Sequence, residues 1–574
     1  MTKSANMPVT AQEQDWPGWP EEAGQRYREA GFWREEVLAD LLTHQAEQRP
    51  DAVALVDGER RWSYAELAAE ARAVAAGLYR LGLRRGDRMV VQLPNRAEFL
   101  LLWFGLQYLG AVPVHAMPGH RGHEISHLLR VTGAVGYAVA DRHARFDYRT
   151  LAASMREEHE ELRHVIVVGD TGGLDDAVGF ADLRSDAPGG RDPGSGRPSP
   201  GGIGLLLLSG GTTGTPKLIP RTHRDYAYNA RAAAAACELT PDSVYLAVLP
   251  AAFNFTMSCP GVLGALTVGA TVVMAPSPAP ETVFPLIERE GVTVTALSPP
   301  MVPVWLEAYA DRAPGSAALD SLAVLQVGGA RLADDLARRV RPTLGCRLQQ
   351  VFGMAEGLIN VTRLDDPEEL VCTTQGRPVS TGDEVRVVDE SGAPVPVGAV
   401  GELLTRGPYT LRGYYRAPEL AATHFTPDGF YRTGDLVRLR PSGHIDVVGR
   451  VKDQINRGGE KIDATEVEGQ LLAHPDVSAV ALVAAPDPDL GERSVAFLVS
   501  AGTPPTVREL GAFLRGRGLA GYKAPDRIEA VDALPLTPVG KVDKNALRER
   551  IRRGPSSPSA TEAARKGVRP RPQG

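Results

Sequence analysis

Alternation of helix-like and strand-like segments is the feature that most limits the folds open to this chain. The segment WSYAELAAEARAVAAGLYRLGL has the apolar periodicity of an amphipathic helix, and the strand-like RMVVQLP follows it after an Arg-Gly-Asp turn. The next segment, LLLWFGLQYLGAVPVH, predicts a buried helix followed by a strand. Such strand–helix–strand units are typical of a doubly wound α/β sheet, which we expect over residues 40–180. Short apolar runs between 240 and 345 continue the pattern.

The other segments divide the 574 residues into further parts. Short strands and glycine-containing turns predict a small β-rich subdomain over 380–450, and a mixed α/β pattern follows it. Pro, Gly and Ser dominate 186–202, which we expect to be a flexible surface loop. We therefore expect an N-terminal extension (1–30), a large N-terminal domain (31–451), a small α+β C-terminal domain (452–552) and a disordered tail (553–574).

Composition and charge exclude several classes of protein. Hydrophobic residues make up 43% and charged residues 23% of the chain, which is ordinary for a globular protein. The net charge of -7 provides no basic surface for nucleic acid. Four scattered cysteines favour neither structural zinc nor a disulfide framework. The polar start is no signal peptide, and the apolar stretch 99–114 is too short to span a membrane. We expect a cytoplasmic protein whose partners are neither nucleic acids nor membranes.

A Gly- and Thr-rich loop, SGGTTGTPK at 209–217, directly follows the buried-strand pattern IGLLLL. Glycines let backbone N–H groups approach an anion closely, hydroxyls add donors, and Lys217 supplies positive charge. The loop is not a Walker A motif, because Pro216 precedes the lysine and Leu218 follows it. A flexible turn is the alternative, but a nine-residue polar loop after a buried strand favours phosphate binding. The predicted phosphate-binding residues are Ser209, Gly210, Gly211, Thr212, Thr213, Gly214 and Lys217.

Four further motifs follow along the chain: QVFGMAEG at 350–357, YRTGD at 431–435, GRVKDQINRGGEK at 449–461 and PLTPVGK at 535–541. Each motif alone is weak, but in this order the set resembles the adenylate-forming superfamily over about residues 30–550. That superfamily contains acyl-CoA synthetases, peptide-synthetase adenylation domains and luciferases. The resemblance implies that a carboxylate is joined to the α-phosphorus of ATP with loss of pyrophosphate. Attack of one anion on another needs charge neutralisation and positioning more than acid–base chemistry.

The resemblance also implies roles for single residues. Lys217 would contact the β- and γ-phosphates, Glu356 would bind Mg²⁺, and Lys541 would contact the substrate carboxylate and the α-phosphate. These three are the expected catalytic residues, with ATP and Mg²⁺ as cofactors. Ala355 stands where the family usually has Thr, which removes one hydroxyl contact. Further ATP contacts are expected from Gly329, Ala330, Val351, Phe352 and Gly353 around adenine, from Asp435 at the ribose hydroxyls, and from Arg450 near ribose and phosphate.

A second half-reaction follows from the same resemblance. The C-terminal domain would be mobile and would rotate about a hinge at Lys452. That rotation would replace the Lys541 loop by Gly458-Gly459-Glu460-Lys461 and open a tunnel for an acceptor thiol. No carrier-like segment with a modifiable serine follows residue 552, so we expect a separate aryl or peptidyl carrier protein to supply the phosphopantetheine thiol.

The segment LPAAFNFTMSC at 249–259 carries the prediction of the acid. Amino-acid-activating relatives have an Asp that pairs with the substrate ammonium; Asn254 cannot form this ion pair, although it can donate and accept hydrogen bonds. The stretches PKLIPRTH, TRGPYT and GLAGYKAPDR resemble stand-alone ligases of 2,3-dihydroxybenzoate or salicylate. In those enzymes His and Tyr usually replace Phe253 and Phe255, and a Ser replaces Cys259 where 2,3-dihydroxybenzoate is the acid. The expected acid-binding residues are Phe253, Asn254, Phe255, Cys259, Gly328 and Val351.

Several alternatives stay open at this point. Cys259 favours salicylate or another 2-substituted aryl acid because a thiol recognises a 3-hydroxyl poorly; the alternative is that Cys259 is simply a small buried hydrophobic residue. Hydroxylated heteroaryl acids or amino analogues that start siderophores or peptide antibiotics are further candidates. An aryl-CoA ligase with free coenzyme A as acceptor is the nearest rival function. Nothing in the sequence demands a luciferase-like oxygenase, and a non-catalytic binding module would need a broken phosphate loop or a missing Lys541, whereas both are intact.

Overall fold

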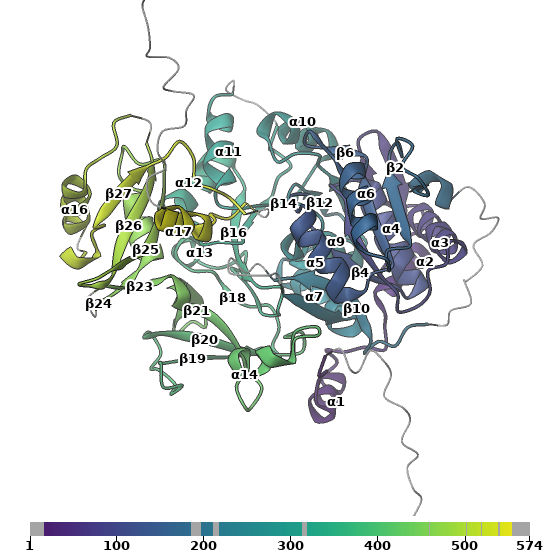
Figure 1. The fold of residues 1–574 in the computed structure, drawn as a ribbon, viewed down its shortest axis with the longest axis horizontal. Coiled ribbons are helices and arrows are strands. Elements are labelled where there is room, and N and C mark those ends of the chain that lie inside the picture. The colour runs from purple at the N-terminus through teal and green to yellow at the C-terminus, as the bar shows by residue number, and fades with distance from the viewer. Residues whose placement is uncertain are drawn as a thin grey trace, which may run out of the picture. The chain divides into compact units, whose positions relative to one another are not determined.

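The computed structural model describes residues 16–184, 197–209, 217–312, 318–457, 460–500, 502–517, 519–537 and 540–553 (Figure 1). The chain forms two compact units. The first comprises residues 1–448 together with 538–541, and the second comprises 449–537 together with 542–574. The units therefore change at Gly449, three residues before the domain boundary that we predict from the sequence, and that boundary stays a prediction.

A nine-stranded sheet forms one layer of the first unit. Its central strands are parallel, and the edge strands β2, β17 and β18 pair antiparallel. In spatial order the strands are β18 (Arg377–Pro378), β17 (Ile359–Val361), β16 (Arg347–Gly353), β15 (Val324–Gly328), β14 (Val294–Leu297), β12 (Val244–Ala247), β13 (Thr271–Met274), β1 (Val53–Asp57) and β2 (Arg60–Ser63).

A second, seven-stranded sheet of the same unit carries the predicted phosphate loop. Its strands are parallel except at the edge, where β10 and β11 pair antiparallel. The run IGLLLL forms β10, as its continuous apolar pattern predicts for a strand that is covered on both faces. In spatial order the strands are β11 (Leu218–Thr222), β10 (Ile203–Leu208), β4 (Val112–His115), β3 (Arg88–Gln92), β5 (Gly136–Ala140), β8 (His164–Val168) and β9 (Val178–Gly179).

The helices around these sheets begin and end where their sequences dictate. The helix α3 (Tyr64–Leu81) starts at Ser63, which forms a capping box with Glu66, and ends at Gly82 in a left-handed conformation. The apolar α4 (Ala97–Leu109) is buried on nearly all sides. Further helices of this unit are α1 (Glu21–Glu29), α2 (Leu38–Gln48), α5 (Gly122–Thr132), α6 (Tyr148–Glu158), α7 (His223–Ala236), α8 (Asn254–Ser258), α9 (Gly261–Val268), α10 (Pro280–Glu290), α11 (Met301–Ala310), α12 (Asp334–Leu344), α13 (Glu368–Thr373) and α14 (Ala421–His424).

Residues 16–30 of the predicted extension pack onto the first unit. The rings of Trp16, Trp19 and Trp33 form successive edge-to-face contacts with centroids 5.2 Å apart, and Tyr27 is buried beside Trp33. No helix in the described part of the chain has both the length and the apolar character that a membrane crossing requires.

The predicted β-rich subdomain is a four-stranded sheet of β19 (Glu384–Val388), β20 (Val400–Arg406), β21 (Tyr431–Leu439) and β22 (Ile445–Arg450). The second unit contains a five-stranded sheet with its own apolar cores. Its elements are β23 (Gln454–Arg457), β24 (Glu460–Asp463), β25 (Ala479–Asp487), β26 (Gly491–Val499), β27 (Arg527–Ala530), α15 (Ala464–Leu471), α16 (Val507–Gly516) and α17 (Lys544–Arg553). The large and small α/β parts confirm the predicted fold class.

Candidate active site

The two ends of the predicted phosphate loop are closed by hydrogen bonds. Leu208 of β10 pairs with Leu218 of β11, and the next residues, Ser209 and Lys217, continue the ladder. Ser209 N donates to Lys217 O at 2.9 Å, and Lys217 N donates to Ser209 Oγ at 3.2 Å. The predicted residues Gly210, Gly211, Thr212, Thr213 and Gly214 lie outside the described residues. The hairpin thus fixes where the loop starts and where its lysine stands.

The Lys217 ammonium lies among groups from a distant part of the chain. Its Nζ is 2.6 Å from His424 Nε2 and 5.0 Å from the ring centroid of Tyr414. His424 Nδ1 faces the Leu420 carbonyl at 3.1 Å, so Nδ1 carries the proton and Nε2 accepts from the lysine. Burial lowers the pKa of Lys217, and the Glu356 carboxylate opposes that shift. Two predicted catalytic residues, Lys217 and Glu356, therefore act on each other electrostatically.

Glu356 is buried, with 8% of its surface exposed. Tyr414 donates to Glu356 Oε1 at 3.2 Å, and the Tyr414 and Tyr431 hydroxyls are 3.0 Å apart. Within the described residues, no three His, Cys, Asp or Glu side chains gather in a way that could hold a metal. A single buried carboxylate nevertheless fits Mg²⁺, which usually takes one or two protein carboxylates and completes its shell with phosphate oxygens and water.

Four of the six predicted acid-binding residues, Phe253, Asn254, Phe255 and Cys259, lie on α8 or directly beside it. Tyr226 donates to Asn254 Oδ1 at 2.8 Å, and Asn254 Nδ2 lies 3.6 Å from Cys259 Sγ. The rings of Phe253 and Phe255 meet edge to face with centroids 6.3 Å apart. Cys259 is 3% exposed, and burial raises the pKa of its thiol to about 12. The segment thus combines one oriented amide with apolar surface.

Gly328, Val351 and Phe255 meet at the ends of neighbouring strands. Gly328 of β15 pairs with Val351 of β16. A Cβ on Gly328 would lie 2.8 Å from Val351 O and 3.0 Å from two atoms of the Phe255 ring. Only glycine leaves room for this arrangement. A Cβ on the next residue, Gly329, would lie 3.5 Å from Lys541 Cε, and residues 538–541 group with this first unit.

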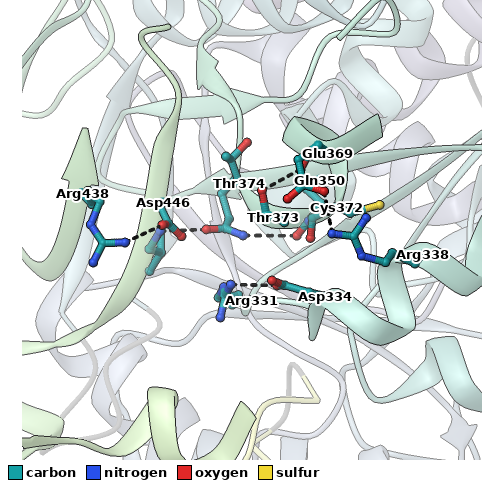
Figure 2. A network of polar contacts seen from close by, with 12 residues as sticks. Arg331, Asp334, Arg338, Gln350, Glu369, Cys372, Thr373, Thr374, Arg438 and Asp446 are labelled. Atoms are coloured by element: carbon teal, nitrogen blue, oxygen red, sulfur yellow. Dashed lines mark hydrogen bonds and ion pairs between the residues drawn. The ribbon is translucent and has the colours of Figure 1, made fainter. Parts of the chain in front are cut away.

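A network of polar contacts holds β16, which carries the predicted adenine contacts Val351, Phe352 and Gly353 (Figure 2). Gln350 donates to the Val371 carbonyl of α13 at 2.8 Å. Gln375 donates to Gln350 Oε1 at 3.3 Å and accepts from the Val447 N–H of β22 at 2.8 Å. Figure 2 also shows Arg438 reaching Asp446 of β22, with 3.3 Å between the charged atoms. The Gln350–Gln375–Val447 contacts join β16 to the four-stranded sheet, and the Arg438–Asp446 pair lies within that sheet.

The other predicted residues take the following places. Phe352 packs partly buried against the apolar core of the four-stranded sheet, and Ala330 follows β15. Asp435 of β21 is 3% exposed, and its N–H donates to Thr433 Oγ1 at 3.0 Å. Arg450 ends β22, Lys452 lies in the short 3₁₀ helix Val451–Asp453, and Glu460 starts β24. Gly458 and Gly459 lie outside the described residues, and for Lys461 only the backbone, in β24, is described.

Sequence reasoning missed the residues that support the site from behind. Arg221 and Asp225 are both fully buried and form an ion pair at 2.7 Å, and Arg221 also donates to the Ala355 carbonyl beside Glu356 at 3.1 Å. Tyr226 and His424, described above, belong to the same group. The spacing of Arg221 and Asp225 by four residues is a signal for an ion pair, but nothing in the sequence shows that the pair is buried.

Comparisons with known proteins identify the family of the chain. The family model "AMP-binding enzyme" matches residues 42–415, and "AMP-binding enzyme C-terminal domain" matches 466–541. The chain is 50% identical to the 2,3-dihydroxybenzoate-AMP ligase of Bacillus subtilis, with 93% of this chain and 97% of that protein covered. It is 50% identical to a salicylyl-CoA synthase / salicylate adenylyltransferase of a Streptomyces species, with the same coverage. It is 49% identical to the salicyl-AMP ligase / salicyl-S-ArCP synthetase of Mycobacterium tuberculosis, with 92% and 93% covered.

Proposed function

The chain belongs to the AMP-binding, adenylate-forming enzymes and is an aryl-acid–AMP ligase, and from this premise we propose its acid, its acceptor and the roles of its residues. The proposed acid is salicylate or a close 2-substituted analogue. The proposed acceptor of the aryl group is the phosphopantetheine thiol of a separate carrier protein in siderophore or peptide natural-product biosynthesis.

The residues around α8 support an aryl acid without an α-ammonium group. The segment 249–259 contains no Asp or Glu, so it offers no charge partner for an ammonium. Phe253, Phe255 and Cys259 present apolar surface suited to a ring. The three relatives named above are 49–50% identical to this chain and are named for either 2,3-dihydroxybenzoate or salicylate, so overall sequence identity does not choose between these two acids. Cys259 favours salicylate, because its thiol is a poor partner for a 3-hydroxyl.

The first half-reaction needs three charged groups of this chain. A carboxylate oxygen of the acid bonds to the α-phosphorus of ATP while the bond to the pyrophosphate oxygen breaks. Lys217 is the proposed partner of the departing phosphates, and Lys541 is the proposed partner of the carboxylate and the α-phosphate. Glu356 would hold Mg²⁺, which neutralises phosphate charge when it is bound. Asp435 would accept hydrogen bonds from the ribose hydroxyls, and Phe352 would stack on adenine.

The choice between carrier protein and coenzyme A rests on the relatives' names, which differ. One relative is a salicyl-S-ArCP synthetase and another is a salicylyl-CoA synthase, at 49% and 50% identity. Incubation of the enzyme with ATP, salicylate and either a phosphopantetheinylated aryl carrier protein or coenzyme A separates the two acceptors. Mass spectrometry should detect the salicyl carrier thioester. If only salicyl-CoA forms, the acceptor is coenzyme A and the proposed carrier protein is wrong.

ATP–pyrophosphate exchange with a panel of acids tests the proposed substrate. We expect the highest kcat/KM with salicylate, a lower value with 2,3-dihydroxybenzoate, and no exchange with phenylalanine. The single observation behind this order is the uncharged, apolar segment around Asn254 and Cys259. Robust exchange with phenylalanine would contradict the proposed acid site, and faster exchange with 2,3-dihydroxybenzoate would contradict the role given to Cys259.

A further inference from the structure

We propose that Tyr226 is a positioning residue that fixes which end of the Asn254 amide faces the aryl acid. In this arrangement the N–H end faces the acid, and the enzyme selects acids whose ortho substituent accepts a hydrogen bond. The inference rests on the proposed function, because that function places Asn254 at the acid. It adds the direction of the hydrogen bond and the residues that determine it, none of which the sequence decides.

The support of α8 begins at Arg221, whose guanidinium can only donate hydrogen bonds. Its Nη2 lies 3.3 Å from Asn229 Oδ1, so the Asn229 carbonyl end faces the arginine. Asn229 Nδ2 then donates to the carbonyl oxygen of Ser258 at 2.6 Å and to Ser258 Oγ at 3.0 Å. Arg221 is itself held by the ion pair with Asp225 in a fully buried position. The guanidinium therefore fixes the orientation of the Asn229 amide, which holds Ser258 on α8, the helix that begins at Asn254.

The orientation of the Asn254 amide follows from its contacts with Cys259 and Tyr226. The Cys259 thiol donates its proton to the Asn254 main-chain carbonyl at 3.5 Å, so its sulfur can only accept from the Asn254 side chain. The Tyr226 hydroxyl donates to Asn254 Oδ1 at 2.8 Å. Since the carbonyl end of Asn254 is occupied by a donor, the amide orientation is assigned.

The N–H end of Asn254 is left with a weak partner. Among the described residues its contact is with Cys259 Sγ at 3.6 Å, and sulfur is a weak acceptor. An amide nitrogen carries two hydrogens, so one N–H stays available for a ligand. Asn254 is 8% exposed, which makes an unmatched ligand group costly there. The site therefore offers the Asn254 N–H as a hydrogen-bond donor, and a ligand that places its own N–H or O–H proton against this group binds less tightly.

This polarity separates two acids of nearly equal shape. In salicylate the hydroxyl proton turns toward the neighbouring carboxylate, which leaves oxygen lone pairs facing outward to accept from Asn254. In 2-aminobenzoate the nitrogen lone pair is delocalised into the ring and a second N–H points outward, so two donors would meet. Specificity is a difference of affinities, and here it comes from an unmatched donor as much as from the matched pair. A ring nitrogen next to the carboxyl group would also be accepted.

The test compares Tyr226→Phe with Tyr228→Phe. Tyr228 is a matched control, because it lies on the same helix and is buried, but its hydroxyl contacts Ser380 Oγ at 2.6 Å instead of Asn254. The readout is the ratio of kcat/KM for salicylate to that for 2-aminobenzoate in ATP–pyrophosphate exchange. We expect Tyr226→Phe to lower this ratio about five- to tenfold, mainly through the KM for salicylate, as loss of one hydrogen bond implies. Tyr228→Phe should keep the wild-type ratio.

Because both acids are measured on one preparation, partial misfolding cancels from the ratio. An unchanged ratio in Tyr226→Phe, with both acids still activated, overturns the inference and leaves the proposed function intact. Absence of exchange with every aryl acid in the wild-type enzyme overturns the proposed function instead. Asn254→Asp is the second variant, because it places an acceptor where the N–H stood. It should reverse the preference toward 2-aminobenzoate, and a retained preference for salicylate would also overturn the inference.

Discussion

Replacement of Gly328 by alanine is the most direct perturbation of the proposed acid site. The added Cβ would lie 2.8 Å from Val351 O and 3.0 Å from Phe255 Cε1 and Cζ. These distances are shorter than ordinary van der Waals contacts of about 3.5 Å, so the carbonyl or the ring must move by several tenths of an ångström. Gly328 does not have a positive φ, so alanine meets no backbone strain there and the effect comes from crowding alone.

The size of the effect follows from the cost of overpacking. An extra carbon in a packed site typically costs about 1–3 kcal/mol. If displacement of Phe255 and Val351 transfers that cost to acid binding, the KM for the acid rises about 5- to 150-fold. The KM for ATP is the second readout, because Val351 is also an expected adenine contact, whereas displacement of Phe255 alone raises only the KM for the acid. ATP–pyrophosphate exchange at saturating ATP, with salicylate as the varied substrate, measures the KM for the acid.

Gly469→Ala provides the matched control. Gly469 lies inside α15, and a Cβ there would meet no atom within 4 Å. Alanine in a helix interior should stabilise the second unit by about 0.5–1 kcal/mol and leave the KM for salicylate unchanged. Thermal unfolding of both variants shows whether the fold is kept. If Gly328→Ala folds and its KM for salicylate stays within about twofold of wild type, the acid does not bind against Gly328, Val351 and Phe255.

Two further predictions concern charge. Lys541→Ala should lower aryl-adenylate formation by about 100-fold or more and leave thiol transfer from supplied aryl-AMP largely intact, since the ammonium serves the first half-reaction; equal losses in rapid-quench assays of both steps would contradict this. His115 is buried, its Nε2 accepts from Trp103 and its Nδ1 donates to the Ala252 carbonyl, and burial lowers its pKa to about 4. Below pH 6.5 the unfolded chain takes up a proton that the folded chain refuses, so stability present above that pH falls by about 2 kcal/mol between pH 7.5 and pH 5. Urea unfolding of His115→Gln should lose about 2 kcal/mol less than wild type over this range, and an equal loss would refute the assignment.

The sequence predicts the frame of the first unit well because its elements have strong local signals. The strand before the phosphate loop follows from six consecutive apolar residues, and α3 follows from its apolar period, Ser63 and Gly82. The small four-stranded sheet follows from its turns. Motif residues such as Glu356 and Asp435 are recognised by their order along the chain, and the structure gives their burial and partners.

The residues behind the site escape such reasoning for a physical reason. Arg221 and Asp225 have the spacing of an exposed ion pair on a helix, yet both are fully buried. The contact of Tyr226 with Asn254 joins residues 28 positions apart and depends on side-chain rotamers. The Lys217 contact with His424 spans 207 positions. Contacts of this kind are fixed by packing of whole elements, and local periodicity carries no information about them.

The burial of the cysteines has a consequence for the chemistry of the bound adenylate. An aryl adenylate acylates any thiolate within reach, and Cys259 lies in the segment proposed to hold the acid. Burial raises the pKa of Cys237, Cys259 and Cys346 to about 12 each. Near pH 7.5, fewer than about one in 10,000 of each of these thiols is ionised, and the thiolate is the nucleophile. At the proposed acid site the enzyme would therefore keep the mixed anhydride of the aryl acid and AMP beside the Cys259 sulfur without acylating itself, and the external thiol would remain the acceptor.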